Sequence, residues 1–300
     1  MVYPTQAIIN EVGPRDGLQN EKTPIPAALK IELIERLAAA GLTSIEATSF
    51  VSPRWVPQLA DGAEVLAGVP RRPGLRYTAL VPNLKGFEAA RAAGADEVAV
   101  FVAASESFSR KNTNCSIAEA LERCAPVLAA AAEAGMPVRG YISCIAGCPF
   151  EGEVSPARVG RLAGELHAMG CHQISLGDTI GVGTPRQIRA AIKAAAVHVP
   201  VERLIGHYHD TYGMALANVH ASLEMGVFRF DSSVAGLGGC PYAPGATGNV
   251  ATEDLAYLMR GLGIETGINM NKLVAVARWI SAKIDRPAQS ALALAWREQG

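Results

Sequence analysis

This 300-residue sequence lacks several features that would identify whole classes of protein. Only 18% of its residues are charged, the formal net charge is −1, and no run of basic residues occurs. A protein that follows a nucleic-acid backbone needs such a run or patch, so nucleic acid is not an expected partner. No apolar stretch reaches membrane-spanning length, and the first residues have neither the charge nor the apolar core of a signal peptide. We therefore expect a cytoplasmic protein without a membrane partner.

Closely spaced cysteine pairs are also missing. The six cysteines are Cys115, Cys124, Cys144, Cys148, Cys171 and Cys240. Without a C-x-x-C pair, neither a disulfide framework nor a structural zinc site is favoured. The spacing of Cys144 and Cys148 half suggests a ligand pair, but packing or a substrate contact explains it better because no second pair is near. Cys240 lies in a glycine-rich loop, where a thiol is either a reactive group or a small packing residue.

Short β-rich runs alternate with longer helical patterns along the whole chain. The expected strands cover residues 7–12, 44–48, 75–81, 97–103, 137–143, 172–176, 203–209 and 228–234. The expected helices cover residues 26–40, 56–67, 84–93, 117–134, 155–169, 185–196, 214–225 and 250–260. A long loop is expected after the fourth strand, and a last helix over 271–284 precedes a short frayed end.

The first helix shows the kind of signal on which these boundaries depend. It opens with Pro26, repeats apolar residues such as Ile34 and Leu37 at helical spacing, and stops at Gly41. Eight strand–helix units in about 260 residues are the count and size of a (β/α)8 TIM barrel. A doubly wound open sheet is the alternative, but the first strand–helix turn lacks its glycine fingerprint. No linker marks a domain boundary, so we predict one TIM-barrel domain over residues 1–300 with a C-terminal helical extension from about residue 264.

One stretch, Ile205 to Gly213, places two histidines two residues apart at the end of a strand. Successive side chains of a strand alternate between its faces, so His207 and His209 point the same way. Two imidazoles side by side can hold a divalent metal. Taken alone, the pair fits equally well with two histidines that only hydrogen-bond their neighbours.

Other polar residues are expected on the same rim, because the C-terminal strand ends and their loops form the active face of a TIM barrel. They are Glu11, Arg15, Asp16, Glu46, Arg110, Lys111, Asn114, Cys115, Arg139, Ser143, Ser175, Asp178, Asp210, Cys240 and Asn249. A loop Arg–Asp pair is usually a solvated ion pair, whereas Glu46 lies between apolar neighbours and is costly to bury alone. Asp16 and the two histidines, with the amide oxygen of Asn249, suit Mg²⁺ or Mn²⁺ and, less firmly, Zn²⁺ or Co²⁺.

Seven stretches together carry a family resemblance. They are residues 11–21 (EVGPRDGLQNE), 48–53 (TSFVSP), 111–116 (KNTNCS), 143–149 (SCIAGCP), 175–181 (SLGDTIG), 207–213 (HYHDTYG) and 232–242 (SSVAGLGGCPY). With these motifs the chain resembles the 3-hydroxy-3-methylglutaryl-CoA lyases, within a wider group of barrel metal-dependent lyases and Claisen-type synthases. The likeness extends over about residues 5–285, and the last motif is specific to the lyases.

The resemblance implies a fold, an activity and a set of site residues. The activity is divalent-metal-dependent cleavage of 3-hydroxy-3-methylglutaryl-CoA to acetyl-CoA and acetoacetate, as in leucine catabolism and ketone-body formation, without an organic cofactor and in a homodimer. The implied metal ligands are Asp16, His207, His209 and Asn249. The implied catalytic residues are Arg15 at the thioester carbonyl, Cys240 as the active-site thiol, Asp16, His207, Glu46 and Asp178. The expected substrate-binding residues are Arg15, Lys22 as a CoA contact, Arg139 and Ser175.

Several alternatives stay open at this point. The general base that takes the hydroxyl proton is Asp16 or a histidine, and the sequence does not decide between them. The substrate is either the methyl-branched compound or a longer-branched 3-hydroxyglutaryl-CoA. A synthase of the isopropylmalate or homocitrate type would make a bond instead, but the C-terminal regulatory domain of such synthases is not seen in this sequence. A barrel that only binds or scaffolds would hold no tight divalent metal.

Overall fold

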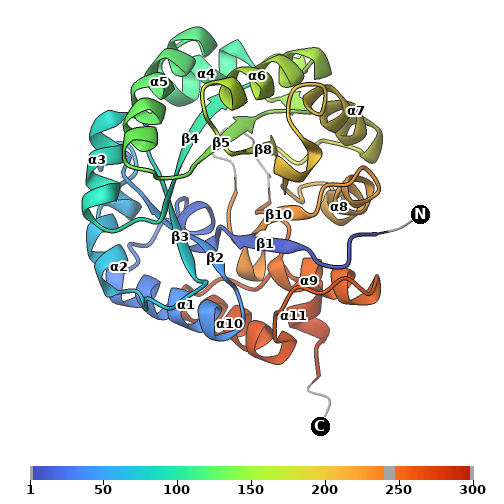
Figure 1. Ribbon diagram of the computed structural model, residues 1–300. Coiled ribbons are helices and arrows are strands. Elements are labelled where there is room, and N and C mark those ends of the chain that lie inside the picture. Colours follow the sequence, from blue (N-terminus) through green and yellow to red (C-terminus); the bar gives the residue numbers. More distant parts are fainter. Residues whose placement is uncertain (1–2, 240–246, 298–300) are drawn as a thin grey trace.

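The parallel strands of the computed structural model, which describes residues 3–239 and 247–297, close into a barrel surrounded by helices (Figure 1). Around the barrel the strand order is β1-β10-β9-β8-β5-β4-β3-β2. The strands are β1 (Ile8–Glu11), β2 (Ser44–Ser49), β3 (Arg76–Leu80), β4 (Glu97–Ala103), β5 (Val138–Ser143), β8 (Gln173–Asp178), β9 (Leu204–Tyr208) and β10 (Arg229–Ser232). The predicted (β/α)8 TIM barrel is therefore confirmed, and an open sheet is excluded.

A helix lies between each strand and the next around the barrel. These helices are α1 (Ala27–Ala39), α2 (Gly62–Gly68), α3 (Leu84–Ala92), α5 (Ile117–Glu133), α6 (Pro156–Ala168), α7 (Pro185–Ala195), α8 (Ala215–Leu223) and α9 (Thr252–Gly261). Short helical turns at the connections are η1 (Gly13–Gly17), η2 (Pro57–Leu59), η3 (Val201–Arg203) and η4 (Val234–Gly236). Of these, η1 and η4 follow β1 and β10 at the C-terminal mouth of the barrel, where the predicted site lies.

The sequence prediction is wrong in two connections and at the chain's end. The long loop expected after β4 contains helix α4 (Glu106–Thr113), whose cap Ser105 accepts a hydrogen bond from the backbone N–H of Phe108 at 3.1 Å. A small antiparallel pair, β6 (Gly147–Cys148) and β7 (Gly152–Glu153), occupies the connection after β5. After α10 (Met270–Lys283), the end expected to fray contains α11 (Ala291–Ala295). Elements of two to eight residues are too short to show a clear periodicity, which is why the pattern missed them.

The two faces of the barrel wall have different chemistry. Helix α1 buries Leu33, Ile34 and Leu37 against the outside of the barrel, in one continuous apolar layer under the helices. The inside of the barrel holds buried polar side chains instead. Five of them form a set that we call the interior cluster: Asn10, Glu97, Arg139, Ser175 and Asp231. Apolar packing on the outside of the barrel thus stabilises the fold, and the polar side chains inside it lie beneath the residues of the mouth.

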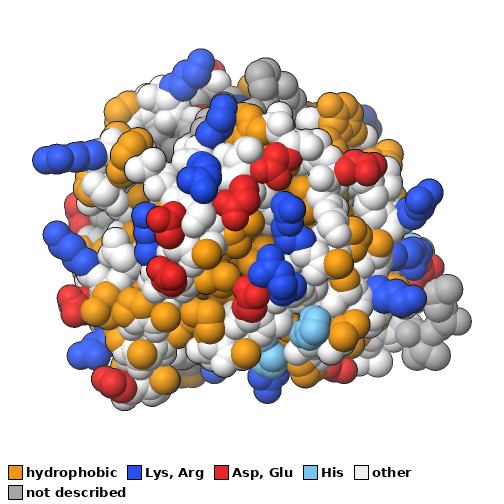
Figure 2. Space-filling view, turned by 90° about the horizontal axis from the view of Figure 1, so that it is seen from above, with side chains coloured by type: hydrophobic (Ala, Val, Ile, Leu, Met, Phe, Trp, Pro, Cys, Tyr) orange, Lys and Arg blue, Asp and Glu red, His pale blue; other side chains and the backbone are white. Residues whose placement is uncertain are grey.

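On the face drawn in Figure 2, no extended patch of the surface carries charges of only one sign. Basic and acidic side chains are interspersed there, with apolar side chains gathered between them (Figure 2). This fits the net charge of −1 and gives no support to a nucleic-acid groove on that face. Within residues 3–239 and 247–297, no helix combines the length and the apolar character needed to cross a bilayer.

Candidate metal and active site

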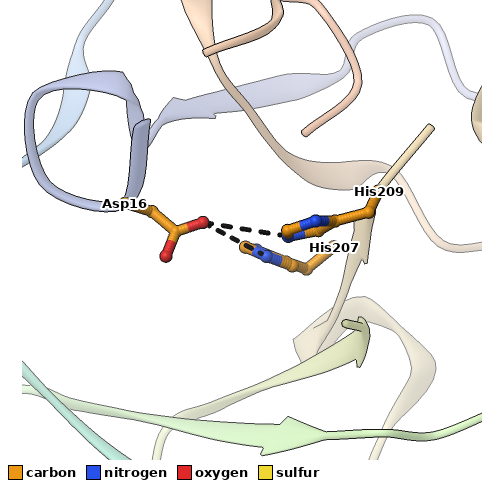
Figure 3. A group of neighbouring side chains, drawn as sticks. All are labelled: Asp16, His207 and His209. Atoms are coloured by element: carbon orange, nitrogen blue, oxygen red, sulfur yellow. Dashed lines mark ion pairs between the residues drawn. The ribbon is translucent and has the colours of Figure 1, made fainter. Parts of the chain in front are cut away.

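The two histidines of the H-x-H stretch lie together at the mouth of the barrel. His207 is in β9 and His209 follows directly after it, and the two residues are only 7% and 4% exposed. Their ring centroids are 5.6 Å apart with an interplanar angle of 39°. Both rings extend toward the same neighbour (Figure 3). The prediction that the two side chains share one face is therefore confirmed.

That neighbour is the carboxylate of Asp16. Its Oδ2 atom lies 3.9 Å from Nε2 of His207 and 3.9 Å from Nε2 of His209. One ligand atom from each of the three side chains lies within 4.8 Å of the others (Figure 3). A carboxylate and two imidazoles at this separation can hold one divalent cation between them.

Asn249 adds a fourth donor to this group. The residue forms an isolated antiparallel bridge with His209, and its Nδ2 donates to Oδ2 of Asp16 at 2.8 Å. Its Oδ1 is buried and has no hydrogen-bond partner. A buried amide oxygen without a partner is costly unless a ligand meets it. The donor set predicted from the sequence therefore fits a divalent cation.

The turn that presents Asp16 is a single π-helical turn, η1. Its position depends on Glu11, whose carboxylate accepts from the backbone N–H groups of Gly13 and Val234, both at 2.9 Å. Gly17 lets η1 approach η4, because a Cβ atom added there would lie 2.8 Å from Cβ of Leu237. Single π-helical turns are rare in proteins, and those that occur are often found at functional sites. The strand ends at this turn, which turns Arg15 and Asp16 toward the mouth.

Arg15 is fixed between two carboxylates. Its Nε and Nη2 donate to Oε2 of Glu46 at 2.8 and 2.7 Å, and its Nη1 donates to Oδ1 of Asp16 at 2.6 Å. The guanidinium carbon also lies 5.7 Å from the ring centroid of Tyr141. Paired carboxylates and an aromatic face hold the cation in one orientation beside the metal ligands. We call Arg15, Asp16, Glu46, His207, His209 and Asn249 the mouth cluster.

The two carboxylates beside Arg15 have opposite pKa shifts. Burial alone raises the pKa of Asp16, but Arg15 and the two histidines outweigh it and the net pKa is lowered. Burial also raises the pKa of Glu46, and there Arg15 does not outweigh it, so the pKa stays above its ordinary value. The guanidinium of Arg15 and the two imidazoles therefore keep the carboxylate of Asp16 ionised, and the ionised carboxylate is the form that binds a cation.

The histidines also differ from each other. Burial lowers the pKa of His207, but its contact with Asp231 and the charge of Asp16 outweigh burial and raise it. Burial and the neighbouring His207 lower the pKa of His209 to about 4. A neutral imidazole is the form that binds metal. His209 is therefore already in the binding form at neutral pH.

Four other predicted site residues lie away from the metal group. The carboxylate of Asp178 accepts from the backbone N–H of Gly183 at 2.9 Å and so holds the loop after β8, while its Oδ1 has no partner. Arg139 and Ser175 belong to the interior cluster, where both donate to the carboxylate of Asp231. Lys22 is exposed on the segment between η1 and α1.

Other rim residues do not join the cluster. The residues after β4 that the sequence placed in a loop, Arg110 and Lys111, lie in helix α4, where Nζ of Lys111 is 4.2 Å from the ring centroid of Phe150. Cys240 falls outside the described residues. The five described cysteines are buried.

Two residues at the site were missed by the sequence prediction. Asp231 contacts Nδ1 of His207 at 3.1 Å, and the hydroxyl of Tyr141 donates to Oε2 of Glu46 at 3.4 Å. The signal for Asp231 was present: an acidic residue inside an apolar strand needs partners, as was argued for Glu46. Tyr141 gave no such signal, because tyrosine is common in strands.

Comparisons with known proteins agree with this geometry. The family model described as HMGL-like matches residues 6–280. The bovine protein named hydroxymethylglutaryl-CoA lyase, mitochondrial, is 57% identical over 293 residues, which cover 98% of this chain and 90% of that protein. A Pseudomonas aeruginosa protein named 3-hydroxy-3-isohexenylglutaryl-CoA/hydroxy-methylglutaryl-CoA lyase is 60% identical over 286 residues, or 95% of each chain.

Solved structures give the same relationship. The crystal structure of hydroxymethylglutaryl-CoA lyase from Pseudomonas aeruginosa superimposes with a TM-score of 0.96 at 59% identity and covers 98% of both chains. An HMG-CoA lyase structure with coenzyme A and 3-methylmalate, attributed to Acinetobacter baumannii, has a TM-score of 0.94 at 37% identity and covers 100% of this chain and 98% of that one.

Proposed function

The chain belongs to the HMGL-like family, and from that membership we propose that it is a divalent-metal-dependent carbon–carbon lyase. Its substrate is 3-hydroxy-3-methylglutaryl-CoA, and its products are acetyl-CoA and acetoacetate. The observation that carries the proposal is the convergence of Asp16, His207 and His209 within 4.8 Å. It stands beside 57–60% identity to proteins that carry the lyase name.

The mouth cluster would hold the cation through Asp16, His207, His209 and Asn249. Oxygen and nitrogen donors without thiolate favour Mg²⁺ or Mn²⁺. When bound, such a cation lowers the pKa of the substrate's tertiary hydroxyl and orients it for cleavage. No organic cofactor is needed for this reaction.

Arg15 acts on the other half of the substrate. Breaking the C2–C3 bond leaves its electron pair on the thioester fragment, as the enolate of acetyl-CoA, while C3 becomes the ketone of acetoacetate. The guanidinium is held by Glu46 and Asp16 before substrate arrives, so it can stabilise the enolate oxygen without reorganising. Glu46 supports Arg15 in this role.

Two protons must move in the reaction. A base takes the proton of the tertiary hydroxyl, and the candidates are Asp16 or a histidine of the mouth cluster. The acetyl-CoA enolate then takes a proton on C2, and Cys240 is the proposed donor. Asp178 holds the loop after β8 and is a supporting carboxylate. Lys22, exposed on the segment after η1, is the proposed contact for the charged part of CoA.

Arg139 and Ser175 were predicted as substrate-binding residues, and both also contact Asp231. Both donate to its carboxylate inside the barrel, where Arg139 also donates to Glu97. Substrate binding by Arg139 and Ser175 stays a prediction, and both also hold Asp231 beneath the mouth.

A longer-branched substrate is a second candidate, for one specific reason. The Pseudomonas aeruginosa relative at 60% identity is named for both an isohexenyl-branched and a methyl-branched glutaryl-CoA. Rates of acetyl-CoA release from the two substrates at equal concentration distinguish the candidates. A methyl specificity predicts a large excess of rate on the methyl compound, and equal rates contradict it.

The wider biological setting is also a proposal. Residues 1–300 would act as one catalytic domain in a homodimer, and the reaction would serve leucine degradation and ketone-body formation. Light scattering of the purified protein tests the dimer. The cytoplasmic location stays a prediction, since the mammalian relatives carry the word mitochondrial in their names.

A further inference from the structure

The carboxylate of Asp231 lies directly under His207, on the side of the ring away from Asp16. Oδ2 of Asp231 is 3.1 Å from Nδ1 of His207, while Nε2 of the same ring faces Asp16. The second histidine has no carboxylate at the equivalent atom: Nδ1 of His209 forms no hydrogen bond to a side chain among the described residues. The two imidazoles of the metal group are therefore held in different ways.

Both oxygens of Asp231 are fully used, and the residue is completely buried. Oδ1 accepts from Nδ2 of Asn10 at 3.0 Å and from Nη1 of Arg139 at 3.2 Å. Oδ2 accepts from Oγ of Ser175 at 2.7 Å and contacts Nδ1 of His207 at 3.1 Å. These partners come from β1, β5, β8 and β9, so strands around half of the barrel fix one carboxylate.

This arrangement decides which nitrogen of His207 carries the proton. An ionised carboxylate only accepts hydrogen bonds, and Arg139 supplies the cation that keeps Asp231 ionised in a buried place. Nδ1 of His207 must therefore be the donor, which leaves the lone pair of the neutral ring on Nε2. That lone pair points into the group formed by Asp16, His207 and His209.

We propose that Asp231, held by Asn10, Arg139 and Ser175, is the positioning residue that fixes the tautomer and orientation of His207 for metal binding. The proposal rests on the proposed metal site and adds a residue that touches neither metal nor substrate. It explains why the barrel interior is polar below the mouth: the interior cluster fixes the orientation of His207, one of the proposed metal ligands. Partners of this kind change metal affinity when they are replaced.

Asp231→Asn is the direct test. The amide oxygen would keep the place facing Arg139, so the amide nitrogen would face Nδ1 of His207 and donate to it. The ring would then carry its proton on Nε2 and lose the lone pair that binds metal. We expect the dissociation constant for Mn²⁺, measured by titration of metal-free protein with paramagnetic resonance detection, to rise about 10- to 100-fold.

Glu97→Gln is the matched control. Glu97 lies in the same cluster and pairs with Arg139 at 3.2 Å, but it does not contact His207. Glu97→Gln, like Asp231→Asn, removes one negative charge from this buried network, so an effect that is only structural should appear in both variants. We expect Mn²⁺ affinity near that of the unmodified protein for Glu97→Gln. Equal losses in the two variants, or an unchanged affinity in folded Asp231→Asn, overturn the proposal.

A measurement on the unmodified protein does not depend on whether Asp231→Asn folds. In metal-free protein at alkaline pH, ¹⁵N spectra of the histidine rings, assigned with His207→Gln, should show His207 with the proton on Nδ1. A proton on Nε2 overturns the proposal. Unmodified protein that binds no Mn²⁺ contradicts the proposed metal site itself, whereas normal binding with the wrong tautomer contradicts only the role of Asp231.

Discussion

The mouth cluster and the interior cluster both combine ionic and neutral polar side chains that are largely buried, yet they differ in how their oxygen acceptors are used. In the interior cluster, Asp231 has four partners, and Glu97 accepts from Thr78 at 2.6 Å and from Arg139 at 3.2 Å and contacts His172 at 3.2 Å. In the mouth cluster, Oε1 of Glu46 and Oδ1 of Asn249 have no partner.

This difference distinguishes buried polar groups that stabilise the fold from buried polar groups that are available to a ligand. Buried polar groups that are fully paired fix one arrangement, whereas unpaired buried acceptors are costly and are retained where a ligand meets them. The one unpaired atom of the interior cluster is a donor, Nε of Arg139. Apart from Asp231, which contacts the proposed metal ligand His207, substitutions in the interior cluster should therefore affect mainly stability, and those in the mouth should affect turnover.

Glu97→Gln is expected to give the largest change in stability. It leaves the buried Arg139 without one of its two carboxylates, and breaking a buried pair in this way costs about 3–5 kcal/mol of unfolding free energy. Denaturant titration measures it, with Glu32→Gln of the exposed Glu32–Arg36 pair as a control that should lose no more than about 0.5 kcal/mol. Lost turnover in a stable Glu97→Gln protein would break the distinction between the clusters.

Arg15→Gln is expected to act mainly on turnover. The guanidinium that faces the developing enolate is lost, and removal of one such donor lowers kcat by about 10²- to 10³-fold. Steady-state rates at saturating substrate measure the change, and circular dichroism checks that the barrel persists. Arg36→Gln, on the surface of α1, is the control. A rate near that of the unmodified protein would remove Arg15 from the mechanism.

Asp178 belongs to neither cluster and gives a smaller, pH-dependent effect. Burial raises its pKa from 3.8 to about 6, so the folded state favours the protonated form. Its contribution to stability is fully present below pH 3.8 and is lost as the pH rises through about 6. Relative to Asp178→Asn, the unmodified protein should lose up to about 3 kcal/mol of unfolding free energy across this window.

Urea titrations of both proteins at several pH values test this expectation. Parallel pH profiles for Asp178→Asn and the unmodified protein would show that the carboxyl has the same pKa in the folded and unfolded states, and would contradict this expectation.

The fold was predictable because its signals are local. Pro26 and Gly41 bracket α1, and the same proline and glycine signals mark other helices. Helix α4 was missed because its residues are mostly polar, although Ser105 offered a capping signal. The sequence pattern therefore finds long elements with a repeated apolar face and misses short ones.

The site was predictable only in part, because side-chain contacts inside a barrel depend on the relative height of the strands. Asp16, His207 and His209 were found from their places at strand ends and come together as expected. The contact between Asp231 and His207 depends on the pairing of β10 with β9, which no local pattern reveals. For the same reason the contacts of Ser175 and Arg139 with Asp231 were not predicted.

The most direct measurement of the central claim is acetoacetate formation from 3-hydroxy-3-methylglutaryl-CoA with and without a metal chelator. The account predicts equal amounts of acetoacetate and acetyl-CoA in the presence of Mg²⁺ or Mn²⁺, no product after chelation, and recovery when the metal is restored. His209→Gln protein, which lacks one proposed ligand, should need far more metal to recover. Cleavage that continues at full rate in metal-free protein would contradict the account.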